Sequence, residues 1–177
     1  MKSASLNELK QELLTLPPKR VLELCLKLAK FKKENKELLS YLLFEADNEQ
    51  GFVESIKLEL DEQFIDLPKG NWYLAKKGLR KILRSIVKYS KHTATKESEV
   101  EMLLHFCQCL QSSGIRYRSY KALSSLYDSQ LKKLNTLIEQ VHEDLRFDYK
   151  KQLESLMDPE DAPSVAKVVR VVQGKIG

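Results

Sequence analysis

The sequence contains few of the residues that build turns and tight loops. Its 177 residues include only six glycines and five prolines, which is too few for many β-hairpins. The glycines are isolated from one another, so the chain has neither a P-loop nor the glycine fingerprint of a dinucleotide-binding fold. These absences exclude the common kinds of nucleotide enzyme.

Cysteine is also scarce, because the chain has only Cys25, Cys107 and Cys109. An odd number of cysteines in predicted helices argues against the disulfide framework of a secreted domain and favours a reducing compartment. No apolar run approaches the length of about 20 residues that a membrane span requires. The N-terminus predicts a capped helix and lacks the apolar core of a signal peptide. We therefore expect a soluble, cytoplasmic protein that does not enter a membrane.

Charged and apolar residues are abundant, and they alternate with the period of an α-helix. The chain is 42% hydrophobic and 31% charged, which suits amphipathic helices with solvated outer faces. Ser5 followed by Glu8 is a capping-box signature, and Pro18 suits the first turn of a second helix. Helices are predicted over residues 6–16, 18–31, 34–47, 52–66, 72–91, 96–112 and about 127–157.

The predicted fold class is all-α. The helices suit a multi-helix bundle or a short stack of antiparallel helix pairs, with a HEAT-like arrangement as an alternative. We expect residues 1–157 to form a single domain and residues 158–177 to form a tail that is flexible or docked on a partner. Segment 34–47 is apolar almost all the way round, which predicts a helix buried among others.

The last predicted helix is long and has a heptad pattern. Its apolar positions begin at Tyr127 and step by four and three to Leu145, after which the phase shifts to Tyr149 and Leu156. A helix of this length extends roughly 45 Å, which is long for a compact domain of this size. It therefore either contacts another copy of the chain or lies across the other helices of one subunit. The C-terminal tail is a second candidate for self-association.

The helix predicted over residues 72–91 is amphipathic and strongly basic. Trp72, Leu79 and Ile86 belong to its apolar side, and no acidic residue occurs between residues 67 and 96. A second basic stretch with tyrosines follows at residues 116–121. The candidate partner-binding residues are Lys77, Arg80, Lys81, Arg84, Lys88, Lys91, Arg116, Arg118 and Lys121.

Two interpretations of this basic surface remain open. Lysine and arginine on one side of a helix can follow phosphates, and nearby aromatic rings can stack on bases, so nucleic acid is a candidate ligand. The preceding segment, residues 45–66, is acidic, so an antiparallel neighbour is also able to neutralise the same surface. No recognised nucleic-acid-binding motif contains these charges.

One group of residues has the spacing of metal ligands. Glu101, His105 and Cys109 are four residues apart and form a stripe along one flank of the helix over residues 96–112. A metal site also needs ligands from elsewhere, so a polar helix flank explains the stripe better. His142 has no second histidine four residues on, which excludes the helical zinc-protease pair. We predict no metal, cofactor or catalytic site.

Several segments resemble a family of uncharacterised bacterial all-helical proteins. They are LAKFKKENKELLSYLLFEADNEQGF, LRKILRSIVKYSK, EVEMLLHFCQCL and HEDLRFDYKKQLE. The resemblance covers most of the chain up to about Leu156 and implies an all-helical fold. It implies no reaction, cofactor or catalytic residue.

Together these observations predict a non-catalytic interaction or scaffold protein. The formal net charge is +5, and the basic helix is the feature that an acidic partner would recognise. Nucleic-acid binding through residues 72–91 and 116–121 is the alternative function.

Overall fold

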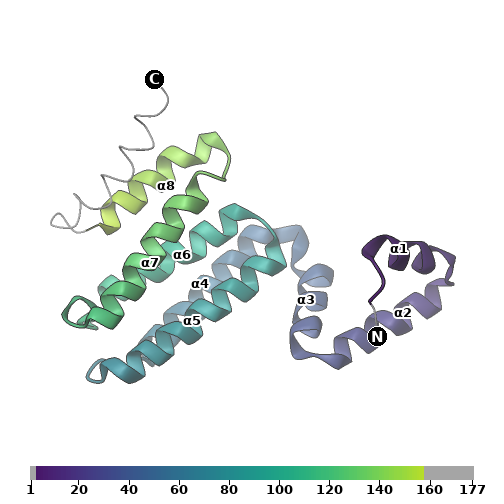
Figure 1. Ribbon diagram of the computed structural model, residues 1–177, viewed down its shortest axis with the longest axis horizontal. Helices are drawn as coiled ribbons and strands as arrows, with labels where there is room; N and C mark the ends of the chain where they lie inside the picture. Colours follow the sequence, from purple (N-terminus) through teal and green to yellow (C-terminus); the bar gives the residue numbers. More distant parts are fainter. Residues whose placement is uncertain (1–2, 158–177) are drawn as a thin grey trace. The chain divides into compact units, whose positions relative to one another are not determined.

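The computed structural model describes residues 3–157, and within them the chain forms eight α-helices, two short 3-10 helices and no strand (Figure 1). The predicted all-α class is confirmed. No helix in this part of the chain is long and apolar enough to cross a bilayer. The α-helices are α1 (Leu6–Thr15), α2 (Pro18–Phe31), α3 (Lys33–Phe44), α4 (Glu49–Ile65), α5 (Trp72–Thr93), α6 (Lys96–Ser112), α7 (Lys121–Ile138) and α8 (Glu143–Leu156). The 3-10 helices are η1 (Ala46–Asn48) and η2 (Tyr117–Ser119).

Several helix ends lie where their capping residues predict them. The backbone N–H of Ser5 donates to the carboxylate of Glu8, whose own N–H donates to the Ser5 hydroxyl, which completes the capping box of α1. Pro18 occupies the first turn of α2. The side chain of Asn71 accepts hydrogen bonds from two backbone N–H groups at the start of α5. These helix ends are predictable because each cap involves residues no more than three positions apart in the sequence.

The chain divides into two compact units between Asp47 and Asn48. The first contains α1, α2 and α3, and the second contains α4 to α8. The sequence prediction of one domain over residues 1–157 does not anticipate this division.

In the first unit, α2 packs against α3, but little side-chain surface is enclosed. Neither α1 nor α2 contains a buried residue, and Tyr41 is the one buried residue of α3. Leu43 is 64% exposed and Phe44 is 79% exposed. The prediction that segment 34–47 is buried among other helices is therefore wrong. The physical reason is size, because three short helices have too little volume to enclose an apolar core.

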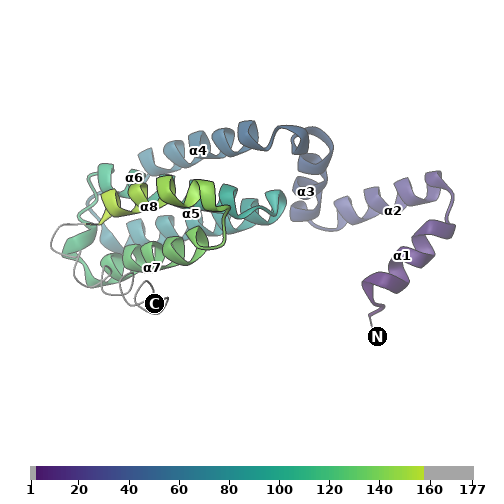
Figure 2. The same cartoon turned by 90° about the horizontal axis from the view of Figure 1, so that it is seen from above.

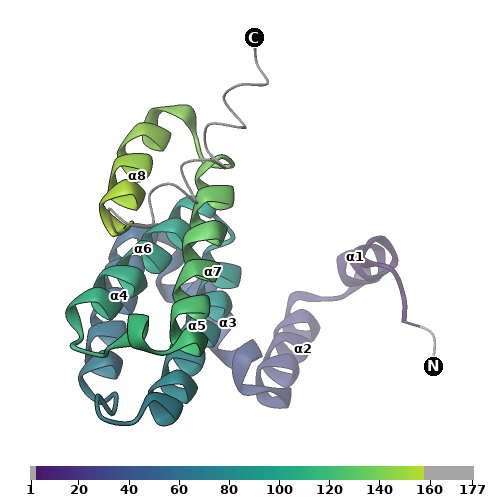
Figure 3. The same cartoon turned by 60° about the vertical axis from the view of Figure 1, so that its left-hand side comes forward.

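The second unit is built around α6. This helix contacts α4, α5, α7 and α8, and it lies among them in Figure 3. Val100, Phe106 and Leu110 on α6 are fully buried. The ring of Phe64 on α4 lies 5.4 Å from the ring of Phe106, centroid to centroid. The core of this unit therefore surrounds α6, and the basic helix α5 packs against it with one side.

The prediction of one long helix over residues 127–157 is wrong, because the structure has two helices there. α7 ends at Ile138 and α8 begins at Glu143, and α8 turns back beside α7 (Figures 1 and 2). The imidazole of His142 accepts a hydrogen bond from the N–H of Asp144, which caps α8. The acidic residues of this first turn also favour a helix N-terminus.

The reversal of the chain between α7 and α8 explains the phase shift in the heptad pattern. Leu131 and Leu134 of α7 and Leu153 of α8 are buried within the same unit. The hydroxyl of Tyr127 donates a 2.8 Å hydrogen bond to the carbonyl of Leu156, which ties the two helices together. Most of the apolar seam is thus covered within the chain, although Leu145 is 39% exposed. Self-association through residues 127–156 stays a prediction. The predicted tail, residues 158–177, lies outside the described residues.

Candidate anion-binding groove

The side of α5 that faces the core follows directly from its sequence. Ala75, Leu79, Ile82 and Ile86 step by three and four residues, and all four are buried. α5 packs mainly against α6 and makes fewer contacts with α4 and α7. Its opposite side therefore remains accessible along the length of the helix.

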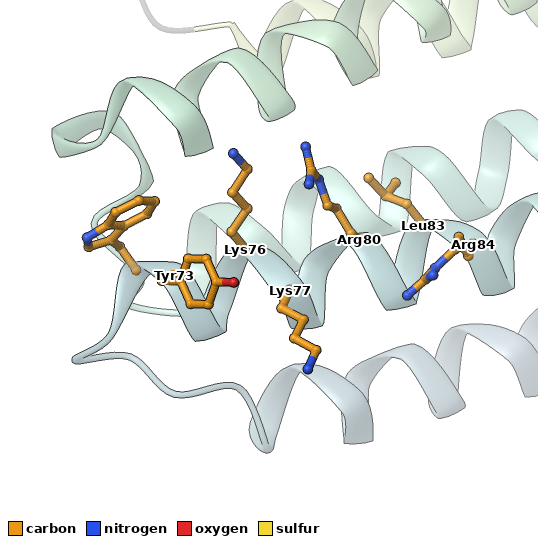
Figure 4. A pocket seen from close by; sticks show the side chains of 7 residues that line it. Tyr73, Lys76, Lys77, Arg80, Leu83 and Arg84 are labelled. Atoms are coloured by element: carbon orange, nitrogen blue, oxygen red, sulfur yellow. The ribbon is translucent and has the colours of Figure 1, made fainter.

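A groove of about 640 Å³ lies over the N-terminal half of α5. Figure 4 shows Lys76 and Arg80 extending from one side of the helix and Lys77 and Arg84 from the other, with Tyr73 near the helix start. The complete lining is Trp72, Tyr73, Lys76, Lys77, Arg80, Leu83 and Arg84.

The four cations of this groove have no acidic partner in the part of the chain that the structure describes. None of their side chains forms an ion pair within residues 3–157, and no carboxylate lines the groove. The acidic helix α4 uses carboxylates elsewhere: Glu54 pairs with Lys57 at 2.8 Å, and Glu59 accepts a 2.9 Å hydrogen bond from the Tyr89 hydroxyl. The groove is therefore an uncompensated cationic surface.

Aromatic rings form one end of the groove. Trp72 stacks on Tyr120 with centroids 5.7 Å apart and an interplanar angle of 21°. Tyr73 lies edge-on to Trp72, with centroids 6.0 Å apart. Trp72 is 41% exposed and Tyr73 is 65% exposed, so both rings offer apolar surface next to the cations.

The predicted residues of α5 separate into two groups. Lys77, Arg80 and Arg84 line the groove. Lys81 and Lys91 are exposed but lie outside its lining. Lys88 also lies outside it, with its Nζ atom 4.4 Å from the centroid of the Tyr89 ring.

The basic stretch at residues 116–121 does not add cations to the groove. Arg118 forms a 3.0 Å ion pair with Asp128, and its guanidinium lies over the rings of Tyr117 and Tyr127 at 5.2 and 5.1 Å. Tyr117 itself is buried, so it cannot stack on a base. Arg116 and Lys121 are exposed but lie outside the lining. The contribution of this stretch is Tyr120, which supports Trp72.

Sequence reasoning missed Lys76 and Tyr73. On a helical wheel, Lys76 lies next to the apolar residues, so the pattern does not place it on the basic face. The spacing of these residues in the sequence nonetheless indicates that they lie close together. Tyr73, Lys76 or Lys77, Arg80 and Arg84 are spaced by three or four residues, which places them along one continuous stripe.

The fold separates the three residues of the α6 stripe that have metal-ligand spacing. His105 Nε2 lies 2.7 Å from Asp61 Oδ1 on α4, and the Cys109 thiol donates to the same oxygen at 3.2 Å. Glu101 instead accepts hydrogen bonds from Lys57 Nζ at 2.8 Å and from the Tyr149 hydroxyl at 3.3 Å. Glu101 therefore lies apart from the other two residues of the stripe, and Asp61 lies beside His105 and Cys109.

Burial and the neighbouring carboxylate determine the state of the Cys109 thiol. Burial, followed by the hydrogen bond and the negative charge of Asp61, raises the pKa of Cys109 to about 12. Burial likewise raises the pKa of Cys107 to about 12. Both thiols are therefore protonated at neutral pH, which makes them poor nucleophiles in this state.

Comparison with models of protein families, with curated proteins and with solved structures finds no significant match. The resemblance to bacterial all-helical proteins therefore stays a prediction from the quoted segments.

Proposed function

We propose that this is a non-catalytic binding protein that presents the α5 groove to an acidic partner. One observation carries the proposal: four cations of α5 line a groove of about 640 Å³, and none of them is paired with a carboxylate of the described chain. A polyanion that neutralises several of these unpaired cations gains favourable electrostatic energy and releases counterions.

The length of the cationic stripe favours an extended ligand. Lys76 and Arg84 are eight residues apart, which corresponds to about 12 Å along a helix. A single small anion cannot contact both ends of such a stripe. A chain with several negative groups can contact several cations at once, so a polymer fits the groove better than an isolated ion.

A second candidate ligand, single-stranded nucleic acid, is favoured by the aromatic end of the groove. Tyr73 and Trp72 expose ring surface beside the cations. Single-stranded nucleic-acid sites combine cations that follow the phosphates with aromatic side chains on which bases stack. An acidic protein segment would use the cations but gain less from the rings.

The test is a binding titration across a salt series with three labelled probes: an acidic peptide, a single-stranded RNA and a single-stranded DNA. Four phosphate contacts to a single strand predict a loss of affinity of about 50-fold between about 50 and 200 mM salt. Replacing the four groove cations by glutamine should weaken binding at low salt by at least about tenfold. This variant carries Lys76→Gln, Lys77→Gln, Arg80→Gln and Arg84→Gln.

A matched control removes the same charge from other exposed positions. Lys36→Gln, Lys96→Gln, Lys132→Gln and Lys151→Gln lower the net charge equally without touching the groove. If both quadruple variants lose affinity to the same degree, binding depends on net charge and the groove is not the site. Absence of binding to all three probes at low salt would also refute the proposal.

One further substitution separates the two candidate ligands. Tyr73→Leu keeps every cation but removes an exposed ring. We expect it to weaken binding of the single strands and to leave binding of the acidic peptide unchanged. An equal effect on all probes would remove the support for base stacking.

A further inference from the structure

A cluster of three potential metal ligands lies where α4 packs against α6. Asp61 comes from α4, whereas His105 and Cys109 are one turn apart on α6. Their ligand atoms all lie within 4.8 Å of one another. This cluster is separate from the α5 groove, because none of its members lines that groove.

We propose that Asp61, His105 and Cys109 form a binding site for a divalent transition-metal ion, with Zn²⁺ as the best match. Imidazole nitrogen, thiolate sulfur and carboxylate oxygen are the ligand types that zinc uses in proteins. Calcium and magnesium bind oxygen ligands instead, so a mixed set with nitrogen and sulfur selects against them.

The geometry requires only small side-chain movements. Tetrahedral zinc with ordinary bond lengths needs ligand atoms about 3.3–3.8 Å apart. The oxygen of Asp61 now lies 2.7 Å from His105 Nε2 and 3.2 Å from Cys109 Sγ. Both distances must lengthen to admit an ion, the first more than the second. The packing of α4 against α6 already holds the three ligand atoms within 4.8 Å of one another. Rotation of the side chains is therefore sufficient to bring them to the distances that an ion requires.

Solvent reaches the cluster and can supply a fourth ligand. The side chain of Asp61 is 46% exposed and that of His105 is 22% exposed. His105 also lines a polar pocket of about 240 Å³, whereas Asp61 and Cys109 lie outside its lining. Lys57 lines the same pocket, but its charge is compensated by Glu54 and Glu101, each at 2.8 Å. Three protein ligands and one water complete a tetrahedron.

Binding changes the protonation of the cluster in a defined way. The thiol of Cys109 loses its proton to solvent and coordinates as thiolate, and His105 coordinates as neutral imidazole. The hydrogen bond from Cys109 to Asp61 is replaced by two bonds to the same ion. Because the ion joins α4 to α6, it should also stabilise the folded state of the second unit.

The test is titration of the reduced full-length protein with Co²⁺, which substitutes for Zn²⁺ and is visible by absorption. We expect one ion per chain, an intense near-ultraviolet band from thiolate-to-cobalt charge transfer, and loss of this band when Zn²⁺ is added. Cys109→Ser should abolish the band. His105→Gln and Asp61→Asn should each weaken binding by about 10- to 100-fold or more.

Matched controls use a cysteine and a histidine outside the cluster. Cys25→Ser and His142→Gln should bind Co²⁺ as the wild type does, with the same band. The unfolding temperature gives an independent readout, because Zn²⁺ should raise it in the wild type and not in Cys109→Ser. The proposal is refuted if the wild type takes up no stoichiometric Co²⁺. It is also refuted if a folded Cys109→Ser keeps the charge-transfer band.

Discussion

Arg118 pairs with Asp128 and covers the rings of Tyr117 and Tyr127. Arg80 lines the groove, and within residues 3–157 it has no ion pair. In the sequence both residues belong to basic stretches that contain aromatics, so composition alone treats them alike. The guanidinium of Arg118 contributes to packing and orientation inside the protein. Only a cation such as Arg80 remains available to a ligand.

Tyr149 makes the stability of the protein sensitive to alkaline pH. Burial, followed by the negative charge of Glu101, raises its pKa from 10 to about 12. A group with a raised folded-state pKa stabilises the fold below its unfolded pKa, and that stabilisation is lost as pH rises from about 10 to 12. Because Tyr149 also lines a water-accessible pocket, we expect a contribution of about 1 kcal/mol.

Urea unfolding of the wild type and of Tyr149→Phe at several pH values checks this expectation. The free energy of unfolding of the wild type should fall more steeply above pH 10 than that of the variant. The comparison cancels the effects of the two thiols with raised pKa values, Cys107 and Cys109, which both proteins share. Parallel curves for the two proteins would show that Tyr149 is not responsible.

At the scale of single elements, α5 depends on the cap that begins it. The Asn71 side chain accepts hydrogen bonds from the N–H groups of Tyr73 and Leu74, at 3.1 Å each. Asn71→Ala should lower the free energy of unfolding by about 1 kcal/mol, because these N–H groups lose their protein acceptor. Urea denaturation measures the change.

Asn71→Ser is the matched control for this prediction. Serine is about as good an N-cap as asparagine, so it should restore most of the lost stability. If alanine and serine destabilise the protein equally, the hydrogen-bond acceptor is not what position 71 contributes. Since the cap precedes Trp72 and Tyr73, probe binding to the alanine variant also shows whether the groove needs a well-ordered start of α5.

The helix α6 has a different role from that of α5. Its residues are buried on several sides because four other helices of the same unit contact it. α5 has a single buried stripe and an accessible opposite side. An amphipathic helix has a clearer sequence pattern than a helix that is buried on most sides. The sequence therefore indicates α5 as the main feature, although α6 organises the core.

At the scale of the whole molecule, the two units should differ in independent stability. The buried residues of α4 to α8 include Leu60, Ile82, Phe106 and Leu134. A fragment with residues 48–177 should therefore fold and unfold cooperatively in urea. The fragment with residues 1–47 should show little helix, because α1 and α2 bury no side chain and short isolated helices are marginal in water.

Far-UV circular dichroism and urea denaturation of the two fragments test this difference. The larger fragment should keep a sigmoidal transition, and the smaller one should show a broad, non-cooperative change. A larger fragment without a cooperative transition would mean that the core of α4 to α8 is insufficient. A stably helical smaller fragment would contradict the second half of the prediction.

The sequence alone determined the helical class and most helix positions. The stripe Ala75, Leu79, Ile82 and Ile86 has helical spacing, and Ser5 and Asn71 are caps that act over three residues or fewer. Periodicity and capping are local interactions, so they can be identified without knowledge of the rest of the fold. The basic stripe containing Lys77, Arg80 and Arg84 was predicted for the same reason.

Tertiary structure alone decided which of these residues meet. It turned α8 back along α7, paired Arg118 with Asp128, and placed Asp61 beside His105 and Cys109. It also left Lys76, Lys77, Arg80 and Arg84 without carboxylate partners in the described chain. The relative placement of helices depends on how apolar side chains such as leucine interlock, and many placements share one hydrophobic pattern. The sequence pattern therefore specifies which face of a helix is buried, whereas packing specifies its neighbour.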